Sequence, residues 1–318
     1  MAILKKIGTI ILRISISLIL LIFLFKQVDF SSLLEVIKKA DKTLLYLSLF
    51  ITFFGYLFCF WRWKMLLDTA EIKLPQKRLI SAFSGGIFFN MFLPSTIGGD
   101  FVRSVDIGYH SKKTSTVVAT VLLDRLSGFV GMIVVSLIAL VFGYGIIKDQ
   151  RIVFAICFLT TLLFLIMLFI FNDRAFGVLK KILAFIRHGK IRSGMLSVLE
   201  QMHGFKGFKS VLFKNLLFSI AIQSVGPITT YMIALSFHLE ISILYFFVFV
   251  PIITAVTLLP ISIGGLGVRD YTTILLFTRI GISKHFAFAL SLLGFIYLLI
   301  YTGIGGLIYV FTLHHRRV

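Results

Sequence analysis

Long apolar stretches, separated by short polar breaks, dominate the chain. They cover Ile7–Phe25, Leu44–Leu67, Thr116–Phe142, Ile152–Phe171, Val211–Phe237 and Phe286–Leu313. About 20 mainly apolar residues are enough for an α-helix to cross the hydrocarbon core of a bilayer. The pattern therefore predicts an all-α integral membrane protein, a helix bundle with about six spanning helices. No small-residue cleavage site follows the first stretch, so we interpret it as a retained helix and not as a signal peptide.

Two shorter apolar runs interrupt this pattern. One is Leu79–Leu93, which contains Gly85 and Gly86 and ends at Pro94, and the other lies before Pro260. Runs this short are more typical of re-entrant segments than of spanning helices. Irregular backbone at membrane depth is tolerated only where protein buries it or where it lines a water-filled cavity. We therefore expect two re-entrant helical segments inside the bundle.

A sequence motif follows each short run. Segment 93–103 reads L-P-S-T-I-G-G-D-F-V-R and segment 259–269 reads L-P-I-S-I-G-G-L-G-V-R, with seven of eleven positions identical. Such a match indicates an internal duplication. We therefore expect one membrane domain over 1–318 that consists of two repeat halves, 1–147 and 148–318.

The longest polar segment, 172–210, is strongly basic, with eight Lys or Arg residues against two acids. Its apolar residues recur at helical spacing, which predicts a basic amphipathic hairpin on the membrane surface; they are Phe176, Leu179, Leu183 and Ile186. If both short runs are re-entrant, this hairpin and both chain termini lie on the cytoplasmic side, as the positive-inside rule requires. The halves then have opposite orientations, which is an inverted repeat of the kind found in many secondary transporters. The lysines of the outer loop 26–42 run against this bias.

Composition and charge agree with a membrane location. The chain is 58% hydrophobic with a mean hydropathy of +1.03, whereas soluble domains are nearer 45–50% apolar. Its net charge of +19 would suggest nucleic acid in a soluble protein, but no recognition motif accompanies the charge. Basic residues in cytoplasmic loops and against anionic headgroups explain it better. We expect the inner or plasma membrane and no nucleic-acid partner.

Each motif has three features that suit an anionic ligand. A proline ends the preceding helix, a glycine pair lets backbone approach a ligand closely, and the next helix begins with free N–H groups. An arginine then supplies a planar, permanently charged fork that fits phosphate. The residues are Pro94, Gly98, Gly99 and Arg103 in the first copy and Pro260, Gly264, Gly265 and Arg269 in the second. We expect two phosphate-binding half-sites; the alternative is that the glycines only form turns and the arginines only anchor at headgroups.

Acidic residues make the two half-sites unequal. Asp100 and Asp106 flank Arg103 at three-residue spacing, so all three can share a helix face and the acids can neutralise the arginine. Asp100 is also placed to cap the helix that the motif begins. In the second copy, Asp270 follows Arg269 directly, and a leucine replaces Asp100.

Other charged residues lie inside expected spans. Asp124 and Arg125 interrupt Thr116–Phe142, and ionisable residues in a span usually face the bundle interior. They either line a pathway or lock helices together. Segment 61–64, W-R-W-K, ends the second span, and tryptophans beside basic residues predict a headgroup boundary there.

Three segments together resemble a known family. They are 85–103 (G-G-I-F-F-N-M-F-L-P-S-T-I-G-G-D-F-V-R), 122–128 (L-L-D-R-L-S-G) and 259–270 (L-P-I-S-I-G-G-L-G-V-R-D). They are similar to the lysylphosphatidylglycerol synthase transmembrane region, also called the flippase-like domain, which is the membrane half of the multiple peptide resistance factor proteins. Asp124 stands where the family commonly has Glu before Arg. The resemblance covers nearly the whole chain and implies translocation of lipids and a link to antibiotic resistance.

The resemblance gives added weight, as pathway residues, to the motif glycines and arginines and to Arg125. Fused members carry a soluble C-terminal domain that transfers lysine from aminoacyl-tRNA to lipid. This chain ends at Val318, directly after its last expected span, so the resemblance implies a stand-alone member. We do not expect lysyl transfer by this chain.

The function that we expect is translocation of a phosphate-bearing lipid, such as an aminoacylated phospholipid or a polyprenyl-phosphate lipid, across the cytoplasmic membrane by alternating access. Two alternatives stay open: a membrane component of a phosphatidylglycerol lysyltransferase or glycosyltransferase system, and a small-solute transporter. Membrane lipids are the expected partners, and a partner synthase, a partner glycosyltransferase and a homodimer stay open. We expect no cofactor, metal or catalytic residue, because the sequence contains no H-E-x-x-H, P-loop or nucleophile elbow.

Overall fold

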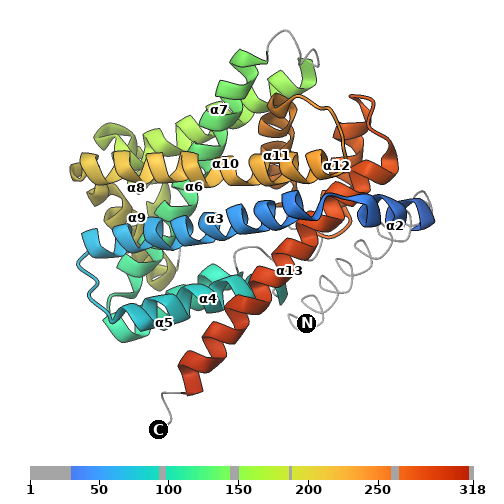
Figure 1. Cartoon of the computed structure of the whole chain (residues 1–318). Helices are drawn as coiled ribbons and strands as arrows, with labels where there is room; N and C mark the ends of the chain where they lie inside the picture. Colours follow the sequence, from blue (N-terminus) through green and yellow to red (C-terminus); the bar gives the residue numbers. More distant parts are fainter. Residues whose placement is uncertain (1–29, 93–97, 144–149, 186–187, 259–264, 315–318) are drawn as a thin grey trace, which may run out of the picture. The chain divides into compact units, whose positions relative to one another are not determined.

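The structure of the protein is a computed structural model that describes residues 30–92, 98–143, 150–185, 188–258 and 265–314. Every regular element in these residues is helical (Figure 1). The elements are α2 (Phe30–Lys39), α3 (Lys42–Thr69), α4 (Gln76–Phe92), α5 (Gly98–Ser111), α6 (Thr114–Phe142), α7 (Gln150–Phe171), α8 (Asp173–Ala184), α9 (Gly189–Gly204), the short 3₁₀ helix η1 (Phe205–Gly207), α10 (Lys209–Ser236), α11 (Ile243–Thr257), α12 (Val268–Thr278) and α13 (Lys284–His314).

Five helices are long and apolar enough to cross a bilayer, namely α3, α6, α7, α10 and α13. They coincide with five of the six predicted spans, and the remaining one, Ile7–Phe25, lies outside the described residues. Large apolar side chains on α7 point away from the protein: Phe154 is 74% exposed and Phe164 is 64% exposed. Surface of this kind is stable against lipid tails and not against water. The prediction of an all-α integral membrane protein is confirmed.

Two further helices are shorter. Helix α4 has 17 residues and α11 has 15, and each lies just before one copy of the motif. Their lengths fit the predicted re-entrant segments, whose path through a membrane stays a prediction.

Contacts between residues divide the chain into two compact units. Unit 1 takes Met1–Phe54, Ser81–Val102 and Val225–Val318, and unit 2 takes Gly55–Ile80 and Arg103–Ser224. Helices α3, α4, α5 and α10 therefore each begin in one unit and end in the other. The repeat halves 1–147 and 148–318 divide the sequence differently and stay a prediction.

Aromatic rings form the interior of unit 1, where α11 and α13 both pack against α12. Phe277 of α12 is fully buried between Phe246 and Phe249 of α11, with ring centroids 5.2 and 5.4 Å away. Edge-on and tilted pairs at such distances add to the dispersion energy of a tight core. This packing fixes the second motif's helix, α12, against its neighbours.

Hydroxyl groups join α3 to α13 within unit 1. Tyr297 donates to the carbonyl of Leu45 at 2.7 Å and lies 2.8 Å from the hydroxyl of Ser48. One turn further, Tyr301 donates to the carbonyl of Leu49 at 2.6 Å. A hydroxyl in hydrocarbon must find a protein partner, so this row sets the register of the two helices.

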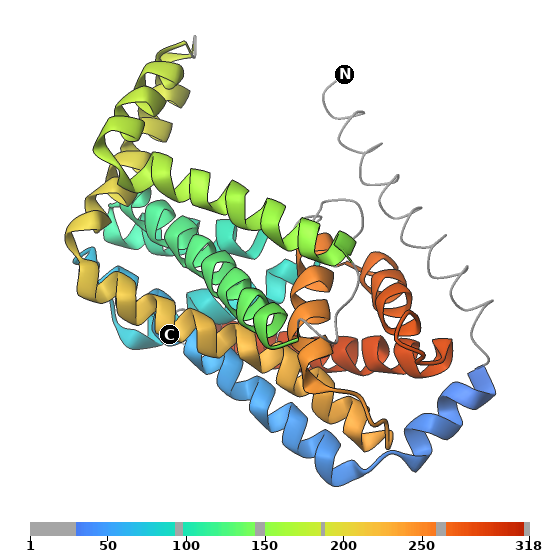
Figure 2. The ribbon, with the colours of Figure 1, turned by 90° about the horizontal axis from the view of Figure 1, so that it is seen from above.

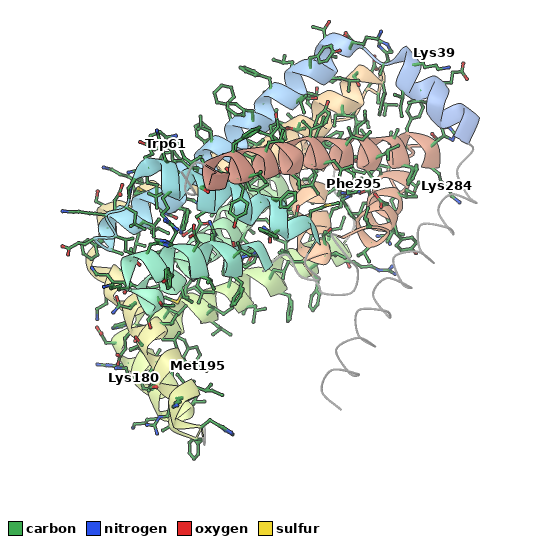
Figure 3. The ribbon with its side chains drawn as sticks, turned by 90° about the horizontal axis from the view of Figure 1, so that it is seen from below. Lys39, Trp61, Lys180, Met195, Lys284 and Phe295 are labelled. Atoms are coloured by element: carbon green, nitrogen blue, oxygen red, sulfur yellow. The ribbon has the colours of Figure 1, made fainter. Side chains whose placement is uncertain are left out.

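Helix α6 is the centre of unit 2, with α7 and α9 packed against it. The buried core joins helices α3, α6, α7 and α9 to η1 and consists of Leu66, Ala119, Leu123, Ile170, Met202 and Phe205. Helices α8 and α9 lie side by side as a hairpin (Figure 2). Figure 3 marks the two arms by Lys180 on α8 and Met195 on α9.

The hairpin matches the segment that the sequence predicts to be amphipathic. Phe176 and Leu183 are buried on the inner face of α8 while Lys180 and Lys181 are on its polar face. The side chain of Asn172 caps α8 by accepting from two backbone N–H groups of the first turn. Ile186, the last residue of the predicted apolar face, lies outside the described residues.

A glycine lets α6 approach α10 closely in unit 2. A Cβ at Gly131 would lie 2.7 Å from the backbone carbon and oxygen of Ser219. Small residues are common where membrane helices touch, because backbone packing replaces the hydrophobic effect there.

We predict opposite effects of alanine at two helical glycines. Gly131→Ala should lower stability by about 1–3 kcal/mol because the added methyl group meets rigid backbone. Gly294→Ala is the control: nothing lies within 4 Å of a Cβ at Gly294 in α13, so alanine should stabilise the helix by about 0.5–1 kcal/mol. Thermal unfolding of the detergent-purified protein measures both, and an equal response at the two positions would contradict the close contact.

Candidate functional site

The carboxylate of Asp124, in α6 of unit 2, binds two arginines at once. Its Oδ1 accepts from Nε of Arg62 at 2.8 Å, and its Oδ2 accepts from a terminal nitrogen of Arg103 at 3.0 Å. Arg62 comes from the second half of α3, and Arg103 is the arginine of the first motif, in α5. Three helices therefore meet at one carboxylate.

Polar and aromatic groups complete this cluster. Ser219 of α10 accepts from Nη1 of Arg62 at 3.1 Å, and Asn215 donates to the carbonyl oxygen of Arg62 at 3.4 Å. The guanidinium of Arg103 lies over the ring of Trp63, 4.7 Å from its centroid. An arginine stacked on an aromatic face and held by a carboxylate has a well-defined orientation.

The cluster is buried. Arg62, Arg103 and Asp124 are each 5% exposed, and Trp63 and Ser219 are fully enclosed. Two arginines and one aspartate give these three side chains a formal charge of +1. Charged groups at membrane depth are costly and are retained where they serve a function or hold each other in place. This buried cluster is the strongest candidate site in the described residues.

The sequence-based interpretation of segment 61–64 is partly wrong. Trp61 is 44% exposed, as expected at a headgroup boundary, but Trp63 and Arg62 point into unit 2. Successive helical residues are about 100° apart, so adjacent members of the W-R-W-K segment face different surroundings. Local composition alone does not reveal which face is buried.

The expected neutralisation of Arg103 by Asp106 is also wrong. Asp106 accepts instead from Arg78 of α4 at 2.7 Å, and His110 is 3.5 Å away. Asp106 therefore ties α5 to the start of α4 within unit 2. The carboxylate that holds Arg103 in this unit is Asp124, which comes from the next helix along the chain.

The first motif's glycines lie against protein at the start of α5. Gly99 is buried, and a Cβ there would collide with the carbonyl oxygen of Gly86 in α4. Its N–H donates to the side-chain oxygen of Asn90 at 2.8 Å. Gly98 is half-buried, and Asp100 is buried in the first turn of α5, where a carboxylate favours the helix dipole.

In the second motif, which lies in unit 1, backbone and side-chain groups bind the carboxylate of Asp270. Gly265 and Gly267 have φ angles of 76° and 79°, which residues with a side chain rarely adopt. Asp270 accepts from the N–H of Gly267 at 2.9 Å and from the hydroxyl of Ser291 at 2.5 Å. Arg269 donates to Asp270 at 2.8 Å.

Arg269 has further contacts with α13. Its Nε donates to Ser291 at 3.1 Å, and its guanidinium lies 5.0 Å from the ring centroid of Phe295. Both motif arginines therefore stack on an aromatic ring and bind a carboxylate. The difference is that Arg103 is held by a residue of another helix, whereas Arg269 is held by its immediate neighbour.

The remaining predicted site residues have no described role. Arg125 is half-buried on α6, beside Asp124 in the chain. Pro94, Pro260 and Gly264 lie outside the described residues. Within the described ranges, no three His, Cys, Asp or Glu side chains come together in a way that could hold a metal ion.

Sequence reasoning missed seven side chains that contact the motif residues or Asp124 and its arginines, which are Arg62, Trp63, Asn90, Asn215, Ser219, Ser291 and Phe295. Arg62 and Asp124 are 62 positions apart, so no local spacing connects them. A charge inside a long apolar helix is the available signal for Arg62, but tryptophans beside basic residues are equally typical of a headgroup boundary.

Long apolar helices define a multi-pass membrane protein, and its unit 2 encloses a buried ionic cluster. A sequence model of the lysylphosphatidylglycerol synthase TM region matches residues 10–306. The chain belongs to this family.

Two curated relatives are similar over most of the chain. A UPF0104 membrane protein, PH1989 of Pyrococcus horikoshii, is 24% identical over 303 residues, which cover 89% of this chain and 90% of the relative. A UPF0104 membrane protein of Methanothermobacter thermautotrophicus is 23% identical over 267 residues, covering 78% and 79%. No solved structure matches the chain.

We predict that Asp124→Asn destabilises the protein by about 3–5 kcal/mol, because two buried guanidiniums then lose their shared carboxylate. Asp68→Asn is the matched control. Asp68 also pairs with a basic residue, Lys64 at 2.5 Å, but its side chain is 55% exposed, so the cost should stay below about 1 kcal/mol. Thermal unfolding in one detergent compares the two, and equal losses would contradict the special role of Asp124.

Proposed function

We propose that the protein translocates a phosphate-bearing lipid across the cytoplasmic membrane by alternating access. The observation that carries this proposal is the buried cluster in which Arg62 and Arg103 share the carboxylate of Asp124. Guanidinium forks bind phosphate and carboxylate oxygens with the same bidentate geometry. A lipid phosphate can therefore take the place of Asp124 on one arginine while the other arginine keeps the carboxylate.

Such an exchange keeps every charge paired. A bare phosphate or guanidinium in hydrocarbon is far more costly than either ion pair. Because Asp124 has two oxygens and two arginine partners, loss of one partner leaves it with the other. The headgroup then moves through the protein while the acyl or polyprenyl tails stay in the bilayer.

In the second motif, Arg269 could bind phosphate in the same way, but its carboxylate partner competes more strongly. Arg269 is 17% exposed at its side chain, and its carboxylate partner Asp270 already holds Ser291 and the motif backbone. An incoming phosphate must compete with a carboxylate that three groups of unit 1 position, namely Gly267 N–H, Arg269 and Ser291. We therefore propose that Arg103 belongs to the stronger phosphate site and Arg269 to the weaker one.

Energy for net movement comes from a gradient or from downhill lipid flow in this proposal, since the sequence has no P-loop for ATP. Family membership supports a lipid as the cargo, and an aminoacylated phospholipid and a polyprenyl-phosphate lipid both carry the required phosphate. The duplicated motif supports alternating access, because repeat halves of opposite orientation can expose one site to either side.

A lipid-translocation assay tests the proposal with purified protein in liposomes that contain fluorescent phosphatidylglycerol. Chemical bleaching from outside removes the outer-leaflet signal, and protein-dependent translocation carries the bleaching beyond that half. We predict that wild-type protein does so and that Arg103→Lys slows the rate about tenfold or more, because lysine keeps the charge and loses the bidentate fork.

Two variants separate transport from folding. Arg103→Gln leaves Arg62 paired with the carboxylate of Asp124, so this carboxylate keeps one guanidinium partner; the variant should unfold near the wild-type temperature and not translocate. Lys64→Gln, at an exposed ion pair on α3, should translocate normally. Full translocation by Arg103→Lys would overturn the proposed phosphate site. No translocation by wild-type protein, for phosphatidylglycerol or a polyprenyl phosphate, would favour a role beside a partner enzyme or in solute transport.

The proposed topology also predicts which loops face the outside of the cell and which face the cytoplasm. With both termini and the hairpin α8–α9 cytoplasmic, the loop between α10 and α11 faces the outside. In a protein without Cys59 and Cys157, an impermeant maleimide applied to intact cells should label Glu240→Cys. It should label Lys190→Cys only after the cells are opened; both positions are exposed in the structure. The reverse pattern would contradict the topology.

A further inference from the structure

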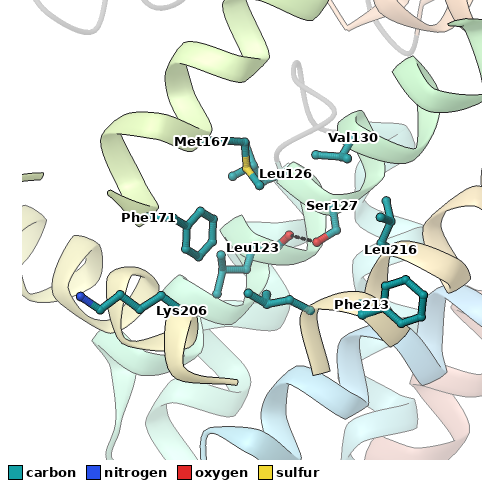
Figure 4. Close-up of a pocket in the computed structure, with 10 residues that line it drawn as sticks. Leu123, Leu126, Ser127, Val130, Met167, Phe171, Lys206, Phe213 and Leu216 are labelled. Carbon is teal, nitrogen blue, oxygen red and sulfur yellow. Dashed lines mark hydrogen bonds between the residues drawn. The ribbon is translucent and has the colours of Figure 1, made fainter. Parts of the chain in front are cut away.

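A cavity of about 450 Å³ opens in unit 2 (Figure 4), and its lining residues include none of Arg62, Arg103 and Asp124. It lies between α6, α7 and α10 and is bounded at one end by η1. Its lining consists of Leu123, Leu126, Ser127, Val130, Met167, Phe171, Lys206, Leu212, Phe213 and Leu216. Its volume falls in the range of about 300–1,000 Å³ that is usual for small-molecule sites.

The apolar walls of this cavity favour a hydrocarbon occupant over water. Eight of the ten lining residues are Leu, Val, Met or Phe. The hydroxyl of Ser127 donates to the carbonyl of Leu123 at 2.8 Å, so it makes its hydrogen bond inside α6 (Figure 4). A cavity needs two to four polar partners to hold an ordered water, and apolar cavities bind apolar ligands instead.

One end of the cavity carries a charge. Figure 4 shows Lys206 at the margin, with its ammonium group directed away from Ser127 and Val130. Lysines commonly cover apolar surface with the aliphatic stem while the ammonium reaches a polar boundary. The cavity is thus amphipathic along its length, with hydrocarbon walls at one end and a cation at the other.

Two partners hold this ammonium in place. Lys206 donates to Asp173 of α8 and, at 3.0 Å, contacts Nε2 of His203. His203 must carry its proton on Nδ1, because that nitrogen lies 2.6 Å from the carbonyl oxygen of Ile170, which can only accept. The hydrogen bond from Lys206 to its carboxylate holds the pKa of Asp173 below its ordinary value. These contacts fix the position of the Lys206 ammonium group at the end of the cavity.

The charge around this end favours an anionic partner. The segment 172–210, which contains the hairpin and η1, has eight basic residues against two acids. Lys209 is exposed at the start of α10, three positions beyond Lys206. Basic residues at a membrane surface each attract anionic lipids by about 1 kcal/mol.

We propose that this cavity holds one acyl chain of an anionic phospholipid whose phosphate lies beside Lys206. Apolar walls select the chain, and Lys206 with the basic surface around it selects the headgroup. The site uses none of Arg62, Arg103, Asp124, Arg269 or Asp270, and it does not require that the protein translocate lipid. Its occupant is a bound lipid that stabilises unit 2 where α6, α7 and α10 leave a gap.

Native mass spectrometry of the detergent-purified protein tests the proposal. Phosphatidylglycerol and phosphatidylcholine with identical acyl chains are the two probes, so only the headgroup differs. We predict that the wild-type protein binds phosphatidylglycerol about fivefold more tightly, in keeping with one well-placed cation. In Met167→Trp, the indole fills the cavity, and binding of both lipids should fall at least about tenfold.

Matched controls distinguish this site from lipid that surrounds any membrane protein. Leu165→Trp places the same indole on α7 at a position that is 44% exposed, and it should bind both lipids like wild type. Val130→Phe fills the cavity from α6 and should repeat the loss seen with Met167→Trp, which protects the result if one variant folds poorly. Equal binding by the cavity-filling variants and by wild type would overturn the proposal.

A second pair of variants tests whether Lys206 selects the lipid headgroup. Lys206→Gln should remove the preference for phosphatidylglycerol and leave phosphatidylcholine binding unchanged. Lys180→Gln removes another lysine of the hairpin, one that pairs with Glu200 at 2.6 Å, and should keep the preference. If both variants lose the preference equally, general surface charge explains it and the assignment of Lys206 is wrong.

Discussion

The shared carboxylate of Asp124 is the interaction on which unit 2 depends. Helices in a bilayer gain little from burying apolar side chains against each other, because lipid tails are equally apolar. Polar contacts and close packing must supply the specificity that the hydrophobic effect gives in water. One aspartate that binds Arg62 and Arg103 fixes α3, α5 and α6 together, and Ser219 and Asn215 extend the hold to α10.

The ion pairs of Asp124 with Arg62 and Arg103 also give a reason to expect a role beyond holding helices together. Replacing a buried ion pair by apolar residues is often neutral or stabilising, so a retained cluster of charges has a cost that stability alone does not justify. A guanidinium binds the oxygens of a phosphate with the same planar fork that it offers to a carboxylate. In unit 1, by contrast, Asp270 is committed to its neighbour Arg269, to Ser291 and to the motif backbone. Arg103 thus binds a carboxylate of another helix, whereas Arg269 binds the carboxylate of its neighbour in the chain.

Length and composition were sufficient to predict the helices. A run of about 20 apolar residues has no stable alternative to a spanning helix in lipid, so α3, α6, α7, α10 and α13 follow from the sequence alone. The face that each helix buries does not follow in the same way. In α3, apolar residues surround the helix, so hydrophobic periodicity could not show that Arg62 and Trp63 point inward while Trp61 points outward. In a soluble helix, the exposed face is polar and makes this choice visible.

The candidate site was predictable only in part, for a similar reason. Repetition of the motif singled out Arg103 and Arg269, and Asp124 stood out as a charge inside a span. Which carboxylate meets which arginine depends on tertiary packing: Asp106 is three residues from Arg103 and yet pairs with Arg78. The glycines could not be interpreted from the sequence either. Gly99 contacts the backbone of α4, and its N–H donates to the side chain of Asn90. No spacing rule connects residues that only the fold brings together.

Whether the buried arginines touch lipid phosphate can be measured directly by solid-state NMR in phosphatidylglycerol bilayers. Arginine labelled with ¹³C at its guanidinium carbon loses signal in proportion to its proximity to ³¹P of the lipid. Surface arginines contribute a constant background, which the difference between wild type and Arg103→Lys removes. We predict that wild-type protein has an additional arginine population in direct contact with phosphorus, which Arg103→Lys lacks. Identical dephasing in the two proteins would mean that Arg103 never meets a phosphate and that the cluster only holds helices together.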